Sequence, residues 1–383
     1  MEETSPPLLL WAPIHWSTRC LYLFVIYAIK VLLAIRWQLM QTGVTLGLLA
    51  RPSGKPIYSK SYPSRPKLKH RFFFPSSHKP GQSHPVYINI HGGGYAFGAP
   101  AYDDEFCAFM SREFNLLVVS VQYSLSPRAT FPTPTQDVVA VVEEILQDDS
   151  LPIDHSRIAI GGFSAGGNLA LSACHLPSLQ GKVKAAVPWY APVDWSVNYE
   201  YKLASRPYRH DKEVDGLAAL APIFNNVYLP TGTDQRDPRL SVLYAKRNEL
   251  PEWIFAIGAE YDMLNDEARR MMIRLAGESE ITGVENVAFE RDGGKLRWRM
   301  VTGAEHSFTH WWLKRGQQAE VTKPLAEKWF REAGRWLREE ACIAAGTYHY
   351  AQTLNFMAGP AFLSRHCLFH ASVEPSSDKV GQY

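Results

Sequence analysis

The stretch Gly161–Gly167, with the sequence GGFSAGG, joins a short apolar run to a longer segment of helical character. Before it, Ile158 and Ile160 stand at alternate positions, as in a buried strand. After it, Asn168–Ala173 has the composition of a helix. A strand, a sharp turn and a helix around Gly-x-Ser-x-Gly form the setting of a nucleophile elbow, which presents a serine at the top of an α/β sheet.

Two glycines suit the backbone that such an elbow requires. Gly162 and Gly166 stand two positions before and two after Ser164, and they lack the Cβ atoms that would collide in a strained turn. The helix behind Ser164 points free N–H groups and its positive end at any developing oxyanion. This stretch alone leaves a second interpretation open, a glycine-rich turn whose serine only caps the helix.

The composition indicates an ordinary globular chain. Its 383 residues are 46% hydrophobic and 20% charged, with a net charge of +2, which is enough length for a large core. The small net charge and the absence of a basic run give no indication of a nucleic-acid partner. The sequence contains no Asn-x-Ser/Thr pattern, so no N-glycosylation site supports secretion.

The cysteines are few and scattered, at Cys20, Cys107, Cys174, Cys342 and Cys367. No close pair suggests a zinc site, and an odd number gives no disulfide framework. We therefore expect no metal centre and no structural disulfide.

Strands and helices alternate through the middle of the chain. We expect strands at 68–74, 86–90, 116–123, 158–163, 185–190, 253–257 and 298–301. We expect helices at 102–114, 135–146, 265–276 and 321–342. This alternation predicts an α/β fold with a mostly parallel, doubly wound sheet. Residues 51–66 read as a linker or irregular edge, and residues 277–296 as an insertion.

The chain is expected to divide into a catalytic domain and flanking segments. Residues 1–50 are interpreted as a hydrophobic helical cap or a membrane-associated segment, and residues 51–342 as the catalytic domain. Residues 196–232 break the alternation and are interpreted as a cap insertion over the carboxyl edge of the sheet, where α/β active sites lie. Residues 343–383 are interpreted as a partly disordered C-terminal extension.

A glycine loop supplies candidate donors for an oxyanion. His91-Gly92-Gly93-Gly94 follows an earlier expected strand, and consecutive glycines allow the backbone to aim N–H groups at a substrate oxygen. We assign Gly92, Gly93 and Ala165 as the donors. His91 precedes the serine and is interpreted as a structural residue that holds this loop.

A serine hydrolase also needs a base and an acid that orients it, and in an α/β-hydrolase the chain order is serine, acid, histidine. Asp262 lies in the loop after the strand at 253–257 and is our candidate acid. His306 lies directly after the last expected strand and is our candidate base. His310, one helical turn further on, is the alternative base.

Together these motifs resemble the hormone-sensitive-lipase family of α/β-hydrolases, which includes the arylacetamide-deacetylase-like esterases. The resemblance runs through roughly residues 85–340. The matching pieces are His91–Gly94, Gln122–Pro127 with Phe131-Pro132 and Asp137, Gly162–Asn168, Asp237–Arg239, Asp262–Glu267 and Gly303–Phe308. The resemblance implies an α/β-hydrolase fold, a cofactor-free carboxylic ester hydrolase with a Ser-Asp-His triad, and a cap built partly from N-terminal helices.

The chain departs from the family pattern at positions that surround the candidate site residues. Phe163 stands where the family usually has Asp, and Ser124–Arg128 reads SLSPR where the family usually has RLAPE. These departures remove charged groups that would support the site without touching Ser164, Asp262 or His306.

The sequence favours an esterase acting on a small or medium acyl ester. Amide hydrolysis, lactone opening and acyl transfer on the same triad stay open, as does a non-catalytic receptor on the same fold. The aromatic residues Tyr95, Phe97, Trp189 and Tyr190 are read equally as pocket lining or as core. The acyl length, the physiological substrate and the oligomeric state cannot be read from the sequence.

An apolar segment near the N-terminus suggests contact with a membrane surface. Leu21–Ile35 is nearly all apolar apart from Lys30, and Trp16 and Trp37 stand outside it, about 30 Å apart in a helix. Its flanks do not fit a signal peptide. We expect an intracellular protein in which this helix is a membrane-associated cap rather than a full span, with Lys30 and Arg36 facing water.

Overall fold

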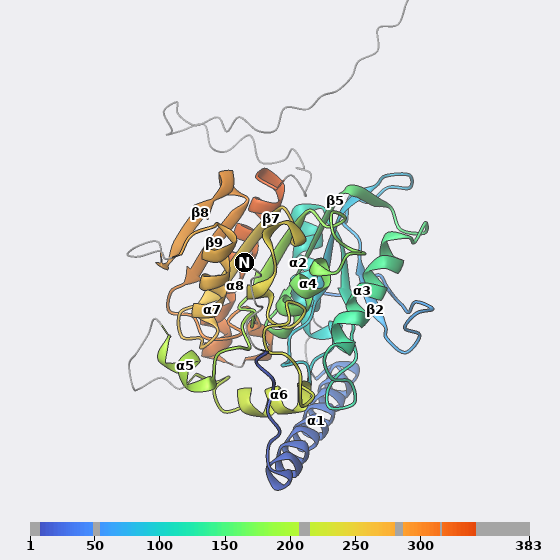
Figure 1. Cartoon of the computed structure of the whole chain (residues 1–383). Coiled ribbons are helices and arrows are strands. Elements are labelled where there is room, and N and C mark those ends of the chain that lie inside the picture. Colours follow the sequence, from blue (N-terminus) through green and yellow to red (C-terminus); the bar gives the residue numbers. More distant parts are fainter. Residues whose placement is uncertain (1–7, 49–53, 207–214, 280–285, 315, 342–383) are drawn as a thin grey trace, which may run out of the picture. The chain divides into compact units, whose positions relative to one another are not determined.

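A nine-stranded sheet forms the centre of the fold in the computed structural model, which describes residues 8–48, 54–206, 215–279, 286–314 and 316–341 (Figure 1). The strands stand in the order β1-β2-β4-β3-β5-β6-β7-β9-β8. Their bounds are β1 Tyr58–Lys60, β2 His70–Phe73, β3 His84–Ile90, β4 Leu117–Val121, β5 Ile153–Phe163, β6 Ala185–Trp189, β7 Trp253–Ala259, β8 Ala288–Arg291 and β9 Leu296–Val301. In this order, the neighbouring strands from β4 across to β9 pair in parallel. The pairs β1–β2, β2–β4 and β9–β8 are antiparallel, so the sheet is mostly parallel, as predicted.

Helices cover both faces of this sheet. Their bounds are α1 Trp16–Thr45, α2 Asp104–Phe114, α3 Thr133–Leu146, α4 Ala165–His175, α5 Tyr199–Ala204, α6 Ala221–Tyr228, α7 Asn265–Leu275 and α8 Gln317–Glu339. Short 3-10 turns are η1 Pro100–Asp103, η2 Val242–Tyr244, η3 Arg247–Glu249, η5 Asp292–Gly294 and η6 Trp311–Leu313. Side chains of α3, α4 and α7 pack in one core, and those of α2 and α8 pack in the other.

The central strands divide their side chains between the two cores. In β3, Val86, Ile88 and Ile90 belong to the core under α3, α4 and α7, whereas Tyr87 belongs to the core under α2 and α8. Successive side chains of a strand point to opposite faces, so a strand covered on both sides needs an almost continuous apolar run. This explains why the central strands are recognisable from their sequence.

The chain changes direction across the sheet beside β3. Strand β3 pairs with β4 on one side and with β5 on the other, so the loops that follow β3 and β5 are neighbours at the carboxyl edge. Ligands bind at such a switch point in open α/β sheets, because the two loops diverge there. The glycine loop follows β3 and the elbow follows β5, so the topology places these two motifs side by side.

Two edge strands were not among the strands expected from the sequence. Strand β1 lies inside residues 51–66, interpreted as a linker or irregular edge, and β8 lies inside residues 277–296, interpreted as an insertion. Both strands are very short and lie at the two edges of the sheet, where β1 pairs with β2 and β8 pairs with β9. Neither therefore carries a long apolar run. The edge alternative for residues 51–66 agrees with β1, whereas the interpretation of residues 277–296 as an insertion missed β8.

Helix α1 and two short helices lie at one end of the sheet (Figure 1). We call residues 196–206 and 215–232, which contain α5 and α6, the cap segment. Ile26 of α1 is fully buried against Phe224 and Val227 of α6 and against Ala96. Helix α1 is longer than the expected apolar segment, and its inner side rests on the cap segment. The predicted extension at 343–383 lies outside the described residues.

Candidate active site

Ser164 occupies a strained turn between β5 and α4. Its backbone has φ 53° and ψ −120°, a conformation that residues other than glycine rarely adopt. A Cβ on Gly162 would lie 2.4 Å from the carbonyl oxygen of Ile90, and one on Gly166 would lie 2.0 Å from the same oxygen. Both positions therefore require glycine. The side chain of Ser164 makes no capping hydrogen bond to α4, so the interpretation as a capping serine is wrong.

The structure brings together the three side chains predicted as nucleophile, base and acid. Nε2 of His306 lies 3.0 Å from Oγ of Ser164. Nδ1 of His306 lies 2.6 Å from Oδ2 of Asp262, whose side chain is completely buried. The other carboxylate oxygen of Asp262 accepts the N–H of Leu264 at 2.9 Å. The three residues follow β5, β7 and β9, so three different strands set their separation.

The charges around His306 favour its protonated form. Burial by itself lowers the pKa of His306, but the carboxylates of Asp262 and Asp215 act in the opposite sense. The net result is a pKa raised above the usual 6.5. An imidazole held this way accepts a proton from Ser164 and keeps it through a short-lived intermediate.

The glycine loop lies directly against the elbow. A Cβ on Gly92 would stand 2.8 Å from the carbonyl oxygen of Phe163, and one on Gly93 would stand 2.3 Å from that of Phe97. Gly93 also has φ 121°. The amides of Gly92 and Gly93 donate to no other group among the described residues. Ala165 is the first residue of α4, where backbone N–H groups have no partner within the helix.

His91 sits beneath the loop rather than beside Ser164. Its ring stacks on Tyr123 with centroids 4.4 Å apart, and its Nδ1 lies 2.8 Å from the carbonyl oxygen of Gly92. The hydroxyl of Tyr123 donates to the carbonyl of His91 at 3.1 Å. Burial lowers the pKa of His91, which keeps the ring neutral. This placement agrees with its interpretation as a residue that holds the loop.

The alternative base, His310, is engaged elsewhere. Its Nε2 lies 3.0 Å from Oδ1 of Asp103, and its Nδ1 lies 3.2 Å from the hydroxyl of Tyr190. Its ring packs edge-on against Phe163 at 4.7 Å. Phe163, the residue that replaces the family's usual Asp, thus supports a second histidine through an apolar contact.

The four aromatic residues left open in the sequence divide between core and cavity lining. Trp189 is fully buried between Phe163 and Phe330 of α8. Tyr95 is also buried, and its ring stacks on that of Tyr228. Tyr190 faces His306, with ring centroids 4.9 Å apart. Phe97 lines a cavity of about 270 Å³ between α1 and the turn after the glycine loop. Trp189, Tyr95 and Tyr190 are therefore core residues, and Phe97 alone of the four lines this cavity.

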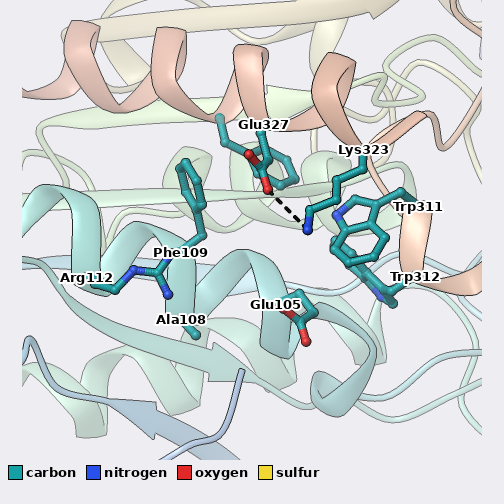
Figure 2. Close-up of a pocket in the computed structure, with 9 residues that line it drawn as sticks. Glu105, Ala108, Phe109, Arg112, Trp311, Trp312, Lys323 and Glu327 are labelled. Carbon is teal, nitrogen blue, oxygen red and sulfur yellow. Dashed lines mark ion pairs between the residues drawn. The ribbon is translucent and has the colours of Figure 1, made fainter. Parts of the chain in front are cut away.

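A smaller cavity of about 130 Å³ lies between α2, η6 and α8, and Figure 2 shows the side chains that line it. None of the predicted site residues lines it. Its charges are compensated locally, since Lys323 lies 3.9 Å from Glu327 and 4.6 Å from the ring centre of Trp311. We assign no function to this cavity.

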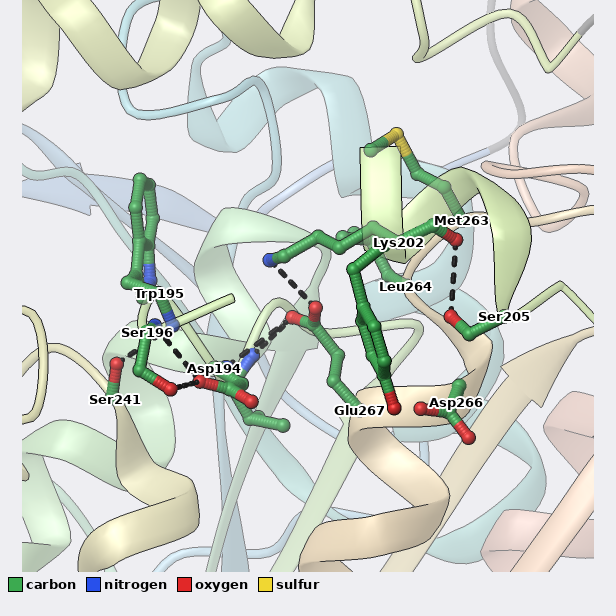
Figure 3. A network of polar contacts seen from close by, with 12 residues as sticks. Asp194, Trp195, Ser196, Lys202, Ser205, Ser241, Met263, Leu264, Asp266 and Glu267 are labelled. Atoms are coloured by element: carbon green, nitrogen blue, oxygen red, sulfur yellow. Dashed lines mark hydrogen bonds and ion pairs between the residues drawn. The ribbon is translucent and has the colours of Figure 1, made fainter. Parts of the chain in front are cut away.

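Sequence reasoning missed three buried charged residues of the cap and its surroundings, Lys202, Asp215 and Glu267 (Figure 3 shows Lys202 and Glu267). Asp215 accepts the N–H of Met263 at 2.7 Å, next to the candidate acid. Glu267 lies in the first turn of α7 and ends the matched piece Asp262–Glu267, but nothing in the sequence indicates that its carboxylate is buried. No motif marks Lys202 or Asp215, because their partners are far away in the chain.

No group of three or more His, Cys, Asp or Glu residues within the described ranges is arranged to hold a metal ion. The described cysteines, Cys20, Cys107 and Cys174, are free thiols. Cys342 and Cys367 lie outside the part of the chain that the structure covers.

Comparisons with known proteins agree on the family. The α/β-hydrolase fold family matches residues 87–293, more than half of the chain. Mouse neutral cholesterol ester hydrolase 1 is 38% identical over 106 residues, which is 25% of this chain and 26% of that protein. The bovine protein of the same name is 42% identical over 88 residues, or 22% of each chain. These matches thus span about a quarter of the length of the curated relatives.

Solved structures share the fold over most of the chain. An α/β-hydrolase enzyme from the Lake Arreo metagenome has a TM-score of 0.61 at 26% identity, over 76% of this chain and 84% of that chain. The thermostable carboxylesterase EstE1, from a metagenomic library, has a TM-score of 0.59 at 25% identity, over 79% and 96%. A Pyrobaculum calidifontis esterase at 20% identity, with a TM-score of 0.60 over 85% of this chain and 98% of that chain, supports the fold alone. The chain belongs to the α/β-hydrolase family, as its motifs predicted.

Proposed function

We propose that the protein is a serine carboxylic ester hydrolase with Ser164 as nucleophile, His306 as general base and Asp262 as the orienting acid. The observation that carries this proposal is the continuous contact from Ser164 through His306 to Asp262. A hydroxyl, an imidazole and a buried carboxylate in this order form the constellation that activates a serine. The named esterases among the similar structures and relatives support the same chemistry.

The reaction follows from the positions of these groups. As Oγ of Ser164 attacks the ester carbonyl, Nε2 of His306 takes its proton, and the C–O bond to the alcohol breaks as His306 returns that proton to the leaving oxygen. Water, deprotonated by the same nitrogen, then attacks the acyl-enzyme, and Ser164 recovers its proton. Asp262 holds the tautomer of His306 that leaves Nε2 free to accept.

The negative oxygen of each tetrahedral intermediate would be held by backbone amides of Gly92, Gly93 and Ala165. Two features support this role: the glycine loop lies against the elbow, and the loop amides have no other acceptor among the described residues. Losing one such donor typically costs about a hundredfold to a thousandfold in kcat.

The expected small or medium acyl group would find apolar surroundings in the cavity beside Phe97, which none of the catalytic or oxyanion residues lines. The cavity beside Phe97 has about 270 Å³ and is lined mainly by apolar residues of α1 and of the turn after the glycine loop. Apolar walls with few polar groups suit an acyl chain rather than a charged substituent. We infer a neutral ester as the substrate class, with no cofactor.

The decisive experiment is a series of p-nitrophenyl esters of increasing acyl length, measured beside the matching anilides, a lactone and an acceptor alcohol. The proposal expects turnover of the esters that is highest at short or medium length and lost in Ser164→Ala. Faster cleavage of anilides or lactones, or faster transfer to the alcohol, would replace the ester assignment. Tight binding of an ester without turnover would favour a receptor.

We also propose that α1 rests on a membrane surface. This helix is long and apolar enough to cross a membrane, yet its inner side is bound to the rest of the chain. Lys30 donates to the carbonyl oxygen of Ser126, so the expectation that Lys30 faces water is wrong, whereas Arg36 is exposed. A full span would break the Lys30 contact and remove Ile26 from its buried position.

The outer side of α1 exposes apolar side chains along most of its length. Its strongly exposed residues include Leu21, Phe24, Val31, Leu32, Ile35 and Leu39. Such a strip of exposed apolar side chains suits insertion into the boundary between headgroups and acyl chains. The cavity beside Phe97 is partly lined by α1, so a membrane-bound α1 would place this cavity close to the lipid.

Flotation with phosphatidylcholine vesicles tests this location. The full chain should float with vesicles, and the double change Leu32→Glu with Ile35→Glu should abolish flotation, because it places two charges on the strip. Val321→Glu, at an equally exposed position on α8, is the matched control and should float normally. Release of the protein by alkaline carbonate is expected; retention would indicate a spanning helix.

A further inference from the structure

The cap segment touches the loop that carries the candidate acid through Asp215. This residue is 5% exposed, and its two carboxylate oxygens accept the N–H groups of Met263 at 2.7 Å and Leu217 at 2.8 Å. Met263 directly follows Asp262, whose own carboxylate accepts the N–H of Leu264. Asp215 therefore fixes the backbone at the turn that aims the carboxylate of Asp262 at His306.

A second buried contact joins the cap segment to α7, directly after the same loop. Lys202 of α5 lies 2.6 Å from a carboxylate oxygen of Glu267 in the first turn of α7 (Figure 3). The other oxygen of Glu267 accepts the N–H groups of Val193 at 2.7 Å and Asp194 at 3.3 Å. Glu267 thus ties together α5, α7 and the segment after β6.

Burying this ion pair carries a free-energy cost, because both charges lose their water of hydration. Burial raises the pKa of Glu267 to about 7, and the ammonium of Lys202 opposes that shift. Neither side chain takes part in the proposed proton transfers. Their common effect is geometric, since Asp215 holds the loop that carries Asp262 and Lys202 holds the first turn of α7 directly after that loop.

Asp215 also acts on the base through its charge. The groups that face or act on His306 are Ser164 from the elbow, Tyr190 after β6, Asp262 from the β7–α7 loop and Asp215 from the cap segment. Glu305, its chain neighbour, is exposed and pairs with Lys314. Of these, Asp262 and Asp215 carry the negative charges that stabilise the protonated imidazole.

We propose that Asp215 and Lys202 are positioning residues, through which the cap segment holds the acid loop in its working geometry. This inference rests on the proposed esterase function. It makes the cap segment part of the catalytic architecture, because a cap segment that moves away from the sheet would release Asp262 and misalign His306. Neither residue touches the substrate, so both act on turnover more than on binding.

The test measures kcat, KM and the pH profile of kcat/KM with a p-nitrophenyl ester. Asp215→Asn should lower kcat by about tenfold to a hundredfold, since small misplacements of catalytic groups have effects of this size. KM should change little. Removing the negative charge also disfavours the imidazolium, so the acidic limb of the profile should move to lower pH. Lys202→Met should lower kcat in the same manner without moving that limb.

Glu200→Gln, an exposed carboxylate-to-amide change on the same helix as Lys202, is the matched control and should behave as the wild type. A wild-type kcat and pH profile in Asp215→Asn would overturn the positioning role, as would an activity loss that only follows the unfolded fraction. If Asp215→Asn does not fold, Lys202→Met decides, and an unchanged kcat overturns the proposal. An inactive wild type that a fluorophosphonate fails to label would instead contradict the esterase function.

Discussion

His310 and Asp103 form a buried pair in which Nε2 of the histidine lies 3.0 Å from the carboxylate. This contact separates the two histidines that the sequence offered as bases. His306 lies against Ser164, whereas His310 belongs to a polar group below the site that includes Tyr190 and Thr309. The distinction gives the first prediction.

His306→Ala should lower kcat/KM by about four to six orders of magnitude, because members of a triad act as a unit. His310→Ala should keep kcat/KM within about tenfold of the wild-type value. It should lower the free energy of unfolding by about 1–3 kcal/mol, because the buried carboxylate of Asp103 loses a hydrogen-bond partner. Steady-state kinetics and chemical denaturation of both variants measure these effects. An inactive His310→Ala beside an active His306→Ala would reverse the assignment.

The pH dependence of turnover should report the raised pKa of His306. The base must be neutral to accept a proton, so kcat/KM should fall as the pH drops through a midpoint above 6.5. The same shift stabilises the folded state below pH 6.5 and loses that contribution as the pH rises through the folded pKa. A pH–rate profile with its acidic midpoint clearly below 6.5 would contradict this electrostatic description.

Gly166→Ala should damage both stability and turnover. The added methyl would lie 2.0 Å from the carbonyl oxygen of Ile90 and 2.5 Å from that of His91, and backbone atoms cannot move aside cheaply. We expect the free energy of unfolding to fall by about 1–3 kcal/mol, with turnover reduced as the glycine loop shifts. Gly216→Ala, where nothing lies within 4 Å, is the control. Equal melting temperatures for both variants would show that the elbow is looser than described.

The thiols should differ sharply in reactivity. Cys20 is exposed, whereas burial raises the pKa of Cys174 and raises that of Cys107 well above its usual value. Maleimide under native conditions should therefore label Cys20 and spare the other two. Reductant should not change the melting temperature, as expected for a chain without a structural disulfide. A fall of several degrees in reductant would refute that expectation.

The central part of the fold could be predicted because its strands are buried on both faces. Covered strands such as β3 and β4 must be apolar throughout, and glycine must fill positions such as Gly166 where backbones almost touch. Chain order then placed Asp262 and His306 in loops after strands. Local sequence therefore contained most of what was needed to anticipate the position of these two residues.

The cap and the edges could not be predicted in the same way. Asp215 and Lys202 depend on partners 48 and 65 positions away, which no local spacing reveals. Strands β1 and β8 are edge strands whose existence depends on a neighbour rather than on their own pattern. The inner contact of Lys30 likewise depends on how α1 packs, so a polar residue in an apolar helix was wrongly expected to face water.

The central claim is that Ser164 is an activated nucleophile, and covalent labelling tests it most directly. The wild-type protein is treated with a fluorophosphonate, and the adduct is located by intact mass and peptide mapping. One adduct per chain on Ser164, absent from a folded Ser164→Ala variant, is the predicted result. Labelling that persists in Ser164→Ala, or that maps to another residue of the wild type, would contradict the assignment.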